Sequence, residues 1–148
     1  MTDRMLSISA AQVHLVQSHL ARLLPQSDAI AALFYAQLFA RNPALQSLFR
    51  TEPQRQGERL MQMLAHAIGM LDRPAALLPV LHALGRRHVA YGVRPAHYAD
   101  VGMALLDTLA QGLGENFGPA ERDAWGAVYA LIARTMQEDV CITAARAA

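Results

Sequence analysis

The chain lacks long hydrophobic runs and has almost no net charge. No apolar stretch reaches the roughly 18 residues that a membrane-spanning helix needs, so we expect no membrane partner. Thirteen Lys and Arg residues against twelve Asp and Glu residues give a net charge of +1 with no basic block, which argues against nucleic acid as a partner. The N-terminus shows no apolar segment followed by a small-residue cleavage site. Together these absences predict a cytoplasmic protein.

Cysteine is almost absent as well. Cys141 is the single cysteine, which excludes an intrachain disulfide and a metal site built from several cysteines. Without a Cys-x-x-Cys-His motif, the chain cannot hold haem through thioether bonds. No Gly-x-Gly-x-x-Gly motif is present either, so we do not expect flavin or nicotinamide binding on these residues.

What is present is the composition of a folded domain. Of the 148 residues, 53% are hydrophobic and 17% are charged, and a chain of this length buries roughly 70% of its unfolded surface. Proline and glycine divide the sequence into segments, and no segment shows the period-two alternation of a strand. We expect a single all-α domain over residues 1–148.

Apolar residues recur at helical spacing in every segment, which predicts six substantial helices and one short one. Ser7 or Ser9 is expected to cap the first helix, and Ser27 or Asp28 the second. A short turn of helix should run from 43 to 48, and a polar link from 51 to 54 should precede the next helix. The following helices should end at Gly92 and near residue 114, and the last should start at Gly118-Pro119.

Two all-α architectures are compatible with this pattern. One is an up-and-down bundle, and the other is a stack whose helices cross pairwise at about 50° around a pocket. The short helix after Pro43 and the long polar crossing after Phe49 favour the stack, because a bundle prefers short hairpin loops.

One of the six histidines has an unusual position. His88 continues an aliphatic stripe at the end of a helix, after Leu77, Leu81 and Leu84. An imidazole there faces the protein interior, where an unpaired polar ring is costly. Coordination of an iron removes that cost and anchors a flat apolar cofactor. Since a lone helical histidine is more often a surface or satisfied core residue, this pattern makes His88 a candidate ligand and no more.

The opposite side of a pocket has four candidate residues, all of which precede His88 in the chain: Tyr35, Phe49, Gln56 and Leu60. Gln56 and Leu60 are four apart and share one helical face. On periodicity alone, Gln56 is typical of a solvent-facing helix start and Tyr35 of an ordinary packing aromatic. Phe49, after the short helix, is typical of a core residue.

Several strings resemble bacterial globins, specifically the globin domains of flavohaemoglobins and their single-domain relatives. The first is LFYAQLF at 33–39, with Asn42-Pro43 and Leu48-Phe49 after it. The second is LGRRH at 84–88, followed by YGV at 91–93 and by HYADVG at 97–102. The third is AWG at 124–126, followed by Tyr129. The similarity runs from about Leu33 to Met136 without an obvious gap.

The resemblance implies a three-over-three globin fold around haem b, held non-covalently. It makes His88 the iron ligand and Phe49 the ring that packs on the haem. Tyr35 and Gln56 become the distal pair, with Leu60 beside the sixth coordination position. On the other side it implies roles for Leu84, Arg87, Val93 and Tyr98 next to the haem, with Arg86 or Arg87 near its propionates. Glu138 or Asp139 would supply an acid to a network around the axial histidine.

The resemblance also implies a function. The chain would bind dioxygen reversibly, take nitric oxide and carbon monoxide as further ligands, and oxidise nitric oxide to nitrate. That activity requires an external reductase, and whether the chain is such an enzyme stays open at this point. The alternatives are an oxygen storage or delivery protein, a haem-based gas sensor, and a helical protein without a cofactor. We expect a monomer or a weak homodimer.

Overall fold

A computed structural model describes residues 8–49 and 52–147, with backbone only for Pro53 and for residues 139–147. Every regular element in this part of the chain is helical, as predicted. The α-helices are α2 (Ala10–Leu23), α3 (Ser27–Arg41), α4 (Pro53–Gly69), α5 (Pro74–Ala90), α6 (Pro95–Leu113) and α7 (Pro119–Ala147). Three 3₁₀ turns connect them: η1 (Leu24–Gln26), η2 (Pro43–Leu48) and η3 (Gly114–Asn116).

Proline sets most of the helix starts. α4, α5, α6 and α7 each begin with a proline, whose fixed φ suits the first helical position and whose missing N–H would be unpaired there in any case. α4 begins at Pro53, so the link predicted for 51–54 is shorter than expected and Gln54 already lies in the helix.

The two predicted caps have different outcomes. Ser9 caps α2: its hydroxyl accepts from the Gln12 N–H at 3.0 Å, and its own N–H donates to Gln12 Oε1 at 3.0 Å. The cap predicted at Ser27 or Asp28 is wrong, because α3 starts at Ser27 without a side-chain cap. The backbone passes from α2 through η1 straight into α3, so few N–H groups are left for a cap to satisfy.

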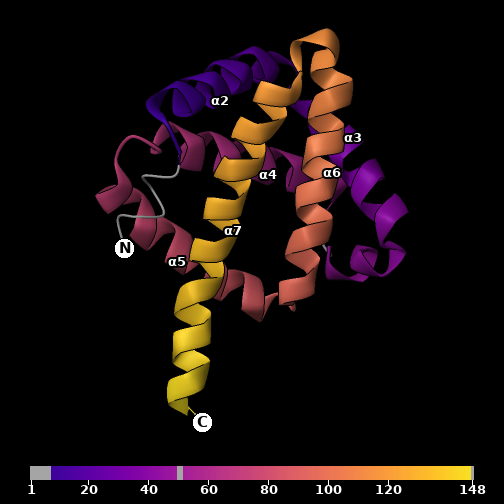
Figure 1. The fold of residues 1–148 in the computed structure, drawn as a ribbon. Coiled ribbons are helices and arrows are strands. Elements are labelled where there is room, and N and C mark those ends of the chain that lie inside the picture. The colour runs from indigo at the N-terminus through magenta and orange to yellow at the C-terminus, as the bar shows by residue number, and fades with distance from the viewer. Residues whose placement is uncertain (1–7, 50–51, 148) are drawn as a thin grey trace.

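The helices form two layers. α6 and α7 lie at the front in Figure 1, and the view from behind brings α4 and α5 forward. α3 packs on α6 and α4, α5 packs on α7, and α2 packs on α7 and α4. This arrangement is the predicted stack of crossing helices, with three helices over three, and not an up-and-down bundle.

The core lies between the layers and contains one notable polar pair. Trp125 and His19 are 1% and 4% exposed, and the indole N–H donates to His19 Nδ1 at 3.2 Å. The bond joins α2 to α7 across 106 residues of sequence. A buried indole and a buried imidazole thus satisfy each other.

Two glycines let helices cross at close range. A Cβ on Gly57 would lie 2.9 Å from the Cβ of Ala31, where α4 crosses α3. A Cβ on Gly85 would overlap the backbone carbonyl of Met136, where α5 crosses α7. Only glycine permits this second contact, since a backbone carbonyl inside a helix cannot move aside.

Among the described residues, no helix is long and apolar enough to span a bilayer.

Candidate haem site

The end of α5 fixes the position of His88. Gly92 has a φ of +93°, a left-handed conformation that favours glycine. Its N–H donates to the Val89 carbonyl and the Val93 N–H to the His88 carbonyl, each at 3.0 Å. These two bonds form a Schellman motif. The predicted helix end at Gly92 is confirmed, and Val93 lies half-buried just beyond it.

The imidazole of His88 presents one nitrogen for coordination. Nδ1 lies 2.9 Å from the Leu84 carbonyl oxygen on the preceding turn, so we assign the proton to Nδ1 and leave a lone pair on Nε2. Burial lowers the pKa of His88 below its ordinary 6.5; the Leu84 hydrogen bond opposes this and the Arg87 charge adds to it. Near pH 7 the ring is neutral, which is the form that binds metals.

Across from α5, four aromatic rings join α3 to the end of η2. The centroid of the Tyr35 ring lies 5.2 Å from that of Phe34, 5.8 Å from Phe39 and 5.3 Å from Phe49. Phe39 and Phe49 are 5.4 Å apart and packed edge to face. Each aromatic pair contributes about 0.5–1.5 kcal/mol beyond the area that it buries. The cluster holds Phe49 beside Tyr35.

Tyr35 and Gln56 meet where α3 faces the start of α4. The Tyr35 hydroxyl donates to the backbone carbonyl of Gln56 at 3.2 Å, and burial raises the pKa of Tyr35 to about 12, so the phenol keeps its proton. The side-chain Oε1 of Gln56 is buried and makes no hydrogen bond to the described residues. Leaving a buried amide group unpaired costs about 1–3 kcal/mol. An unpaired buried amide oxygen of this kind calls for an explanation, and a bound ligand or an ordered water is one.

Two tyrosines connect α6 to α7, one of them Tyr98, which the resemblance assigns to the His88 side. The Tyr129 hydroxyl donates to the Tyr98 carbonyl at 2.6 Å, and the absence of a side chain on Gly102 makes room for the Tyr129 ring. Burial raises the pKa of Tyr98 and, to a greater extent, that of Tyr129. Periodicity predicted that Tyr129 faces inward. Its bond to Tyr98 could not be predicted, because a hydroxyl that bonds a carbonyl 31 residues away leaves no periodic signal.

Glu138 lies on the face of α7 that meets α5. Its carboxylate is 3.9 Å from Nε2 of His82, and each of the two side chains is 32% exposed. His82, six residues before His88, had no predicted role. The place of Glu138 in a network around His88 stays a prediction, and the side chain of Asp139 lies outside the described residues. Arg86 and Arg87 are both exposed near the C-terminal end of α5.

Half-buried apolar side chains lie on both sides of the candidate site. α4 has few contacts with α5, although α4 packs closely on α3 and α5 on α7. Apolar side chains on both sides are only half-buried at the edge of the core: Tyr35, Phe39, Phe49, Leu60, Leu64, Leu84, Tyr98 and Val101. Half-buried apolar surface on two facing helices is typical of a site for a flat apolar ligand.

Comparison with known proteins identifies the family. The family profile described as Globin matches residues 32–136, well over half of the chain. The chain belongs to the globin family. The match contains every predicted site residue except Glu138 and Asp139, which lie beyond its end.

Bacterial flavohemoproteins are among the relatives of this globin. The Bordetella parapertussis flavohemoprotein is 36% identical over 123 residues, which is 80% of this chain and 30% of that protein. The Chromobacterium violaceum flavohemoprotein is 33% identical over 140 residues, 92% of this chain and 33% of that protein. This globin thus spans about a third of the length of these relatives.

A solved structure shares the fold. It is an engineered carbene transferase based on a nitric oxide dioxygenase candidate from Rhodothermus marinus, with a TM-score of 0.81 and 28% identity. The similarity covers 95% of this globin and 99% of that chain.

Membership of the globin family implies a haem cofactor, and the residues described above fit one. Nε2 of His88 offers a neutral nitrogen ligand. The half-buried side chains offer apolar contacts to a porphyrin, and Gln56 carries a buried polar atom without a partner among the described residues.

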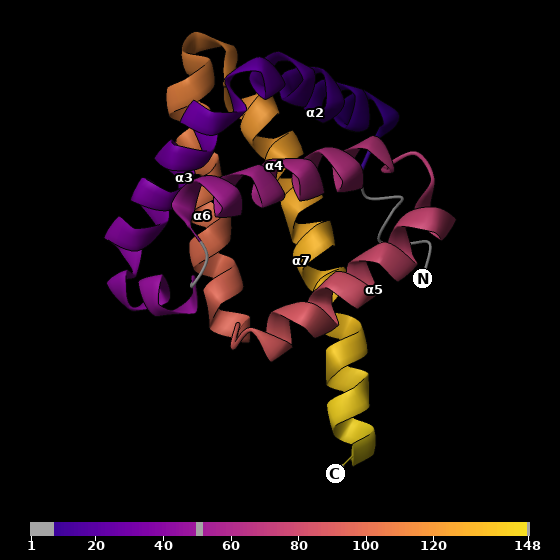
Figure 2. The same cartoon turned by 180° about the vertical axis from the view of Figure 1, so that it is seen from behind.

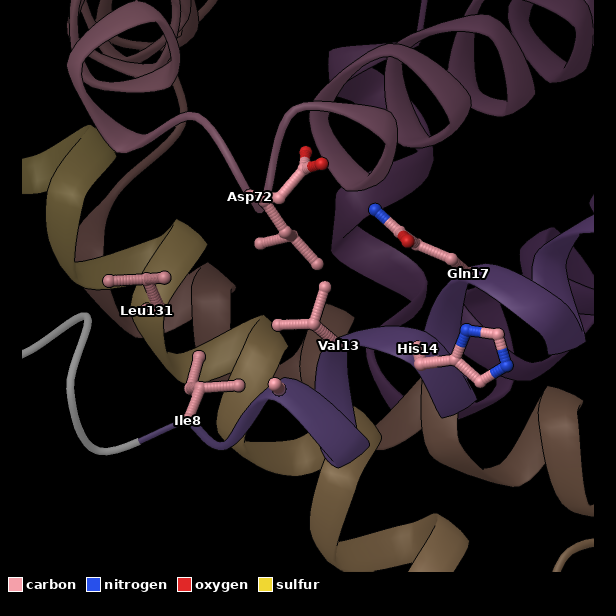
Figure 3. A pocket seen from close by; sticks show the side chains of 8 residues that line it. Ile8, Val13, His14, Gln17, Asp72 and Leu131 are labelled. Carbon is pink, nitrogen blue, oxygen red and sulfur yellow. The ribbon is translucent and has the colours of Figure 1, made fainter.

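A separate cavity of about 390 Å³ lies between α2, the link from α4 to α5, and α7 (Figure 3). Ile8, Val13, Leu71 and Leu131 supply apolar walls, and His14, Gln17 and Asp72 supply polar groups. None of its lining residues is a predicted site residue, so the cavity is not the haem site.

Proposed function

We propose that this globin binds haem b non-covalently through His88, binds dioxygen and oxidises nitric oxide to nitrate with electrons from a separate reductase. When bound, the haem supplies the iron at which dioxygen and nitric oxide react. The names of the relatives support the proposal, since they include flavohemoproteins and a protein derived from a nitric oxide dioxygenase candidate.

The observation that carries the proposal is a bonded pair of side-chain-bearing positions, Tyr35 and Gln56, next to half-buried apolar side chains and with an unpaired oxygen on Gln56. Tyr35 and Gln56 lie on α3 and α4, across from α5 (Figure 2). A small ligand that acquires partial negative charge is stabilised by a nearby donor. A half-turn of the Gln56 carboxamide would place its NH₂ where the unpaired Oε1 now lies.

Tyr35 has a positioning role in this proposal. Its hydroxyl holds the Gln56 backbone at 3.2 Å, and its ring is fixed by Phe39 and Phe49. Leu60, one turn after Gln56, excludes water from the same face of α4. A dry surrounding strengthens the hydrogen bond that Gln56 donates.

On the other side, the bond from His88 Nδ1 to Leu84 sets the orientation of the ring and increases the donor strength of Nε2. We propose that Tyr98 and Glu138 tune this ligand further, that Val93 and Phe49 contact the porphyrin, and that Arg87 reaches a propionate. Donor strength on this side favours oxygen activation over simple carriage.

Nitric oxide consumption tests the proposal. The haem-loaded protein, supplied with a flavin reductase or a reduced ferredoxin in aerated buffer, should consume nitric oxide faster than the same amount of free haem and should form nitrate. Consumption no faster than that of free haem would contradict the enzymatic role. If the protein failed this test, released dioxygen slowly and oxidised slowly in air, it would be a storage or delivery protein.

A further inference from the structure

Positive charge is concentrated on one stretch of this chain. Residues 73–99, which form α5 and the start of α6, contain Arg73, Arg86, Arg87 and Arg94 and no Asp or Glu. The whole chain has thirteen basic and twelve acidic residues, which leaves nine basic against twelve acidic residues elsewhere. The stretch therefore carries +4 and the remainder −3, although the net charge is close to zero.

Large apolar side chains are exposed within the same stretch. Tyr91 is 61% exposed and Val89 is 50% exposed, and the side chains of Arg87 and Arg94 are exposed beside them in sequence. We call these four residues the α5 corner. Tyrosine and arginine are enriched at the energetically important positions of protein interfaces. An exposed aromatic ring between arginines is thus typical of a docking surface.

The α5 corner touches the candidate iron ligand. The ring of Tyr91 lies 6.0 Å from the ring of His88, centroid to centroid, at an interplanar angle of 52°. A protein seated on Tyr91 would therefore lie one aromatic ring away from the axial histidine.

Two acidic groups on the adjoining helices α6 and α7 have partners within the chain. Asp100 of α6 accepts from Asn42 Nδ2 at 3.1 Å, and Glu138 of α7 lies 3.9 Å from His82. These contacts place the two carboxylates beside Asn42 and His82, neither of which belongs to the α5 corner.

We propose that the α5 corner docks the acidic face of an electron-donor protein that carries a flavin or an iron–sulfur cluster. This inference rests on the proposed function, which requires such a donor. With haem bound at His88, the docked donor would give up one electron to the ferric iron, and no covalent bond would form or break. A symmetric dimer through this surface is disfavoured, because two stretches of +4 repel each other.

Reduction of the ferric, haem-loaded protein by an acidic ferredoxin tests the proposal. The second-order rate constant would be measured by stopped flow without oxygen or nitric oxide, at low and high ionic strength. Arg94→Glu should lower it roughly tenfold at low ionic strength and much less at high ionic strength, because salt screens the attraction. Arg94→Gln should give an intermediate loss.

Two further variants locate the effect. Tyr91→Ala should weaken binding of oxidised ferredoxin roughly tenfold by calorimetry, because it removes an exposed aromatic contact. The matched control is Arg122→Glu, an exposed arginine in the first turn of α7, at the end of that helix remote from its crossing with α5 (Figure 1). It makes the same change of charge and should alter the rate constant less than twofold.

The outcomes are separable. Equal losses for Arg94→Glu and Arg122→Glu, or a rate constant that does not depend on salt, would overturn the docking surface. The docking surface would also be overturned if Tyr91→Ala or Arg94→Glu disrupted a dimer or a nucleic-acid complex and left reduction by ferredoxin unchanged. Because nitric oxide is absent from these measurements, normal reduction together with a failure to consume nitric oxide would contradict the proposed function alone.

Discussion

The two sides of the candidate haem site are held by different kinds of interaction. The side that carries Tyr35 depends on ring packing, with Phe39 and Phe49 at centroid distances of 5.8 and 5.3 Å. The side that carries His88 depends on backbone hydrogen bonds, from its ring to Leu84 and from Val93 to its carbonyl. The energy of a ring contact changes gradually as the rings shift, whereas the energy of a hydrogen bond falls steeply when donor and acceptor are misaligned.

We infer that the two sides have different tasks. An axial ligand must keep one orientation, and a helix end closed by backbone bonds holds it in that orientation. In the proposed function the Tyr35 side takes more than one small molecule, and aromatic packing tolerates small shifts. Each prediction below tests one half of this comparison, and they run from the largest expected effect to the smallest.

His88→Ala should abolish stoichiometric haem binding, because no other described residue is a candidate to coordinate the iron in place of its Nε2. The haem content of the purified protein, measured as the pyridine haemochrome, should fall to a few per cent of wild type and recover when imidazole is added. His82→Ala, on the same helix, is the matched control and should keep its haem. Full haem content in His88→Ala would contradict the assignment of His88 as the iron ligand.

Gly85→Ala should destabilise the fold more than Gly57→Ala. The new methyl group at 85 meets the Met136 backbone, which cannot move aside, so we expect a loss of about 3 kcal/mol. At 57 the methyl group meets the Ala31 side chain, and the better helix propensity of alanine, about 1 kcal/mol, offsets part of the cost. Urea unfolding of both variants measures the difference. Equal losses would contradict the greater rigidity of the His88 side.

Gln56→Leu should accelerate dioxygen dissociation, because it removes the donor proposed to face the ligand. A hydrogen bond worth about 1–3 kcal/mol corresponds to roughly 5–150-fold in the rate constant. Stopped-flow displacement with carbon monoxide measures it. Gln62→Leu, an exposed position on α4, is the control. The same rate in Gln56→Leu and wild type would exclude Gln56 as the donor.

Tyr129→Phe should cost more stability than Tyr35→Phe. Each removes one hydroxyl donor to a backbone carbonyl, at 2.6 Å for Tyr129 and 3.2 Å for Tyr35. We expect about 1.5 kcal/mol for the first and about 0.5 kcal/mol for the second, by denaturant unfolding. The reverse order would mean that the side with Tyr35 is the more rigid one.

His19 lies outside both sides of the site and should affect folding only. Burial, aided by the charge of Arg22 and opposed by that of Glu121, lowers the pKa of His19 below 6.5. Its neutral form accepts from Trp125, so as the pH falls below 6.5 the unfolded chain takes up the proton first and stability is lost. Unfolding free energies of wild type and His19→Gln between pH 5 and 8 should show a steeper acid loss in wild type. Parallel curves would contradict this role.

Much of the fold could be predicted because its signals are local. The cap at Ser9, the helix end at Gly92 and the prolines at helix starts are choices of backbone conformation that one or a few residues make. The cap predicted at Ser27 or Asp28 was wrong because a polar residue after a turn is ambiguous, and only the path of the backbone through η1 decides whether the helix is interrupted there.

The candidate site required more than local signals. A histidine at the end of an aliphatic stripe made His88 a candidate, and resemblance to bacterial globins supplied roles for Tyr35, Gln56 and Phe49. Contacts such as Tyr35 with the Gln56 carbonyl join residues 21 positions apart. Periodicity describes one helix at a time and carries no information on such pairs.

The sequence by itself determined the all-α class, the helix boundaries set by proline and glycine, and the family to which the strings at 33–39 and 84–102 point. These follow from dihedral preferences and side-chain spacing within single segments. Only the tertiary structure decided that Nδ1 of His88 pairs with Leu84, that Gln56 keeps an unpaired oxygen, and that the exposed ring of Tyr91 lies against His88. The reason is physical: which groups are buried, paired or exposed depends on how the helices cross, and no single helix contains that information.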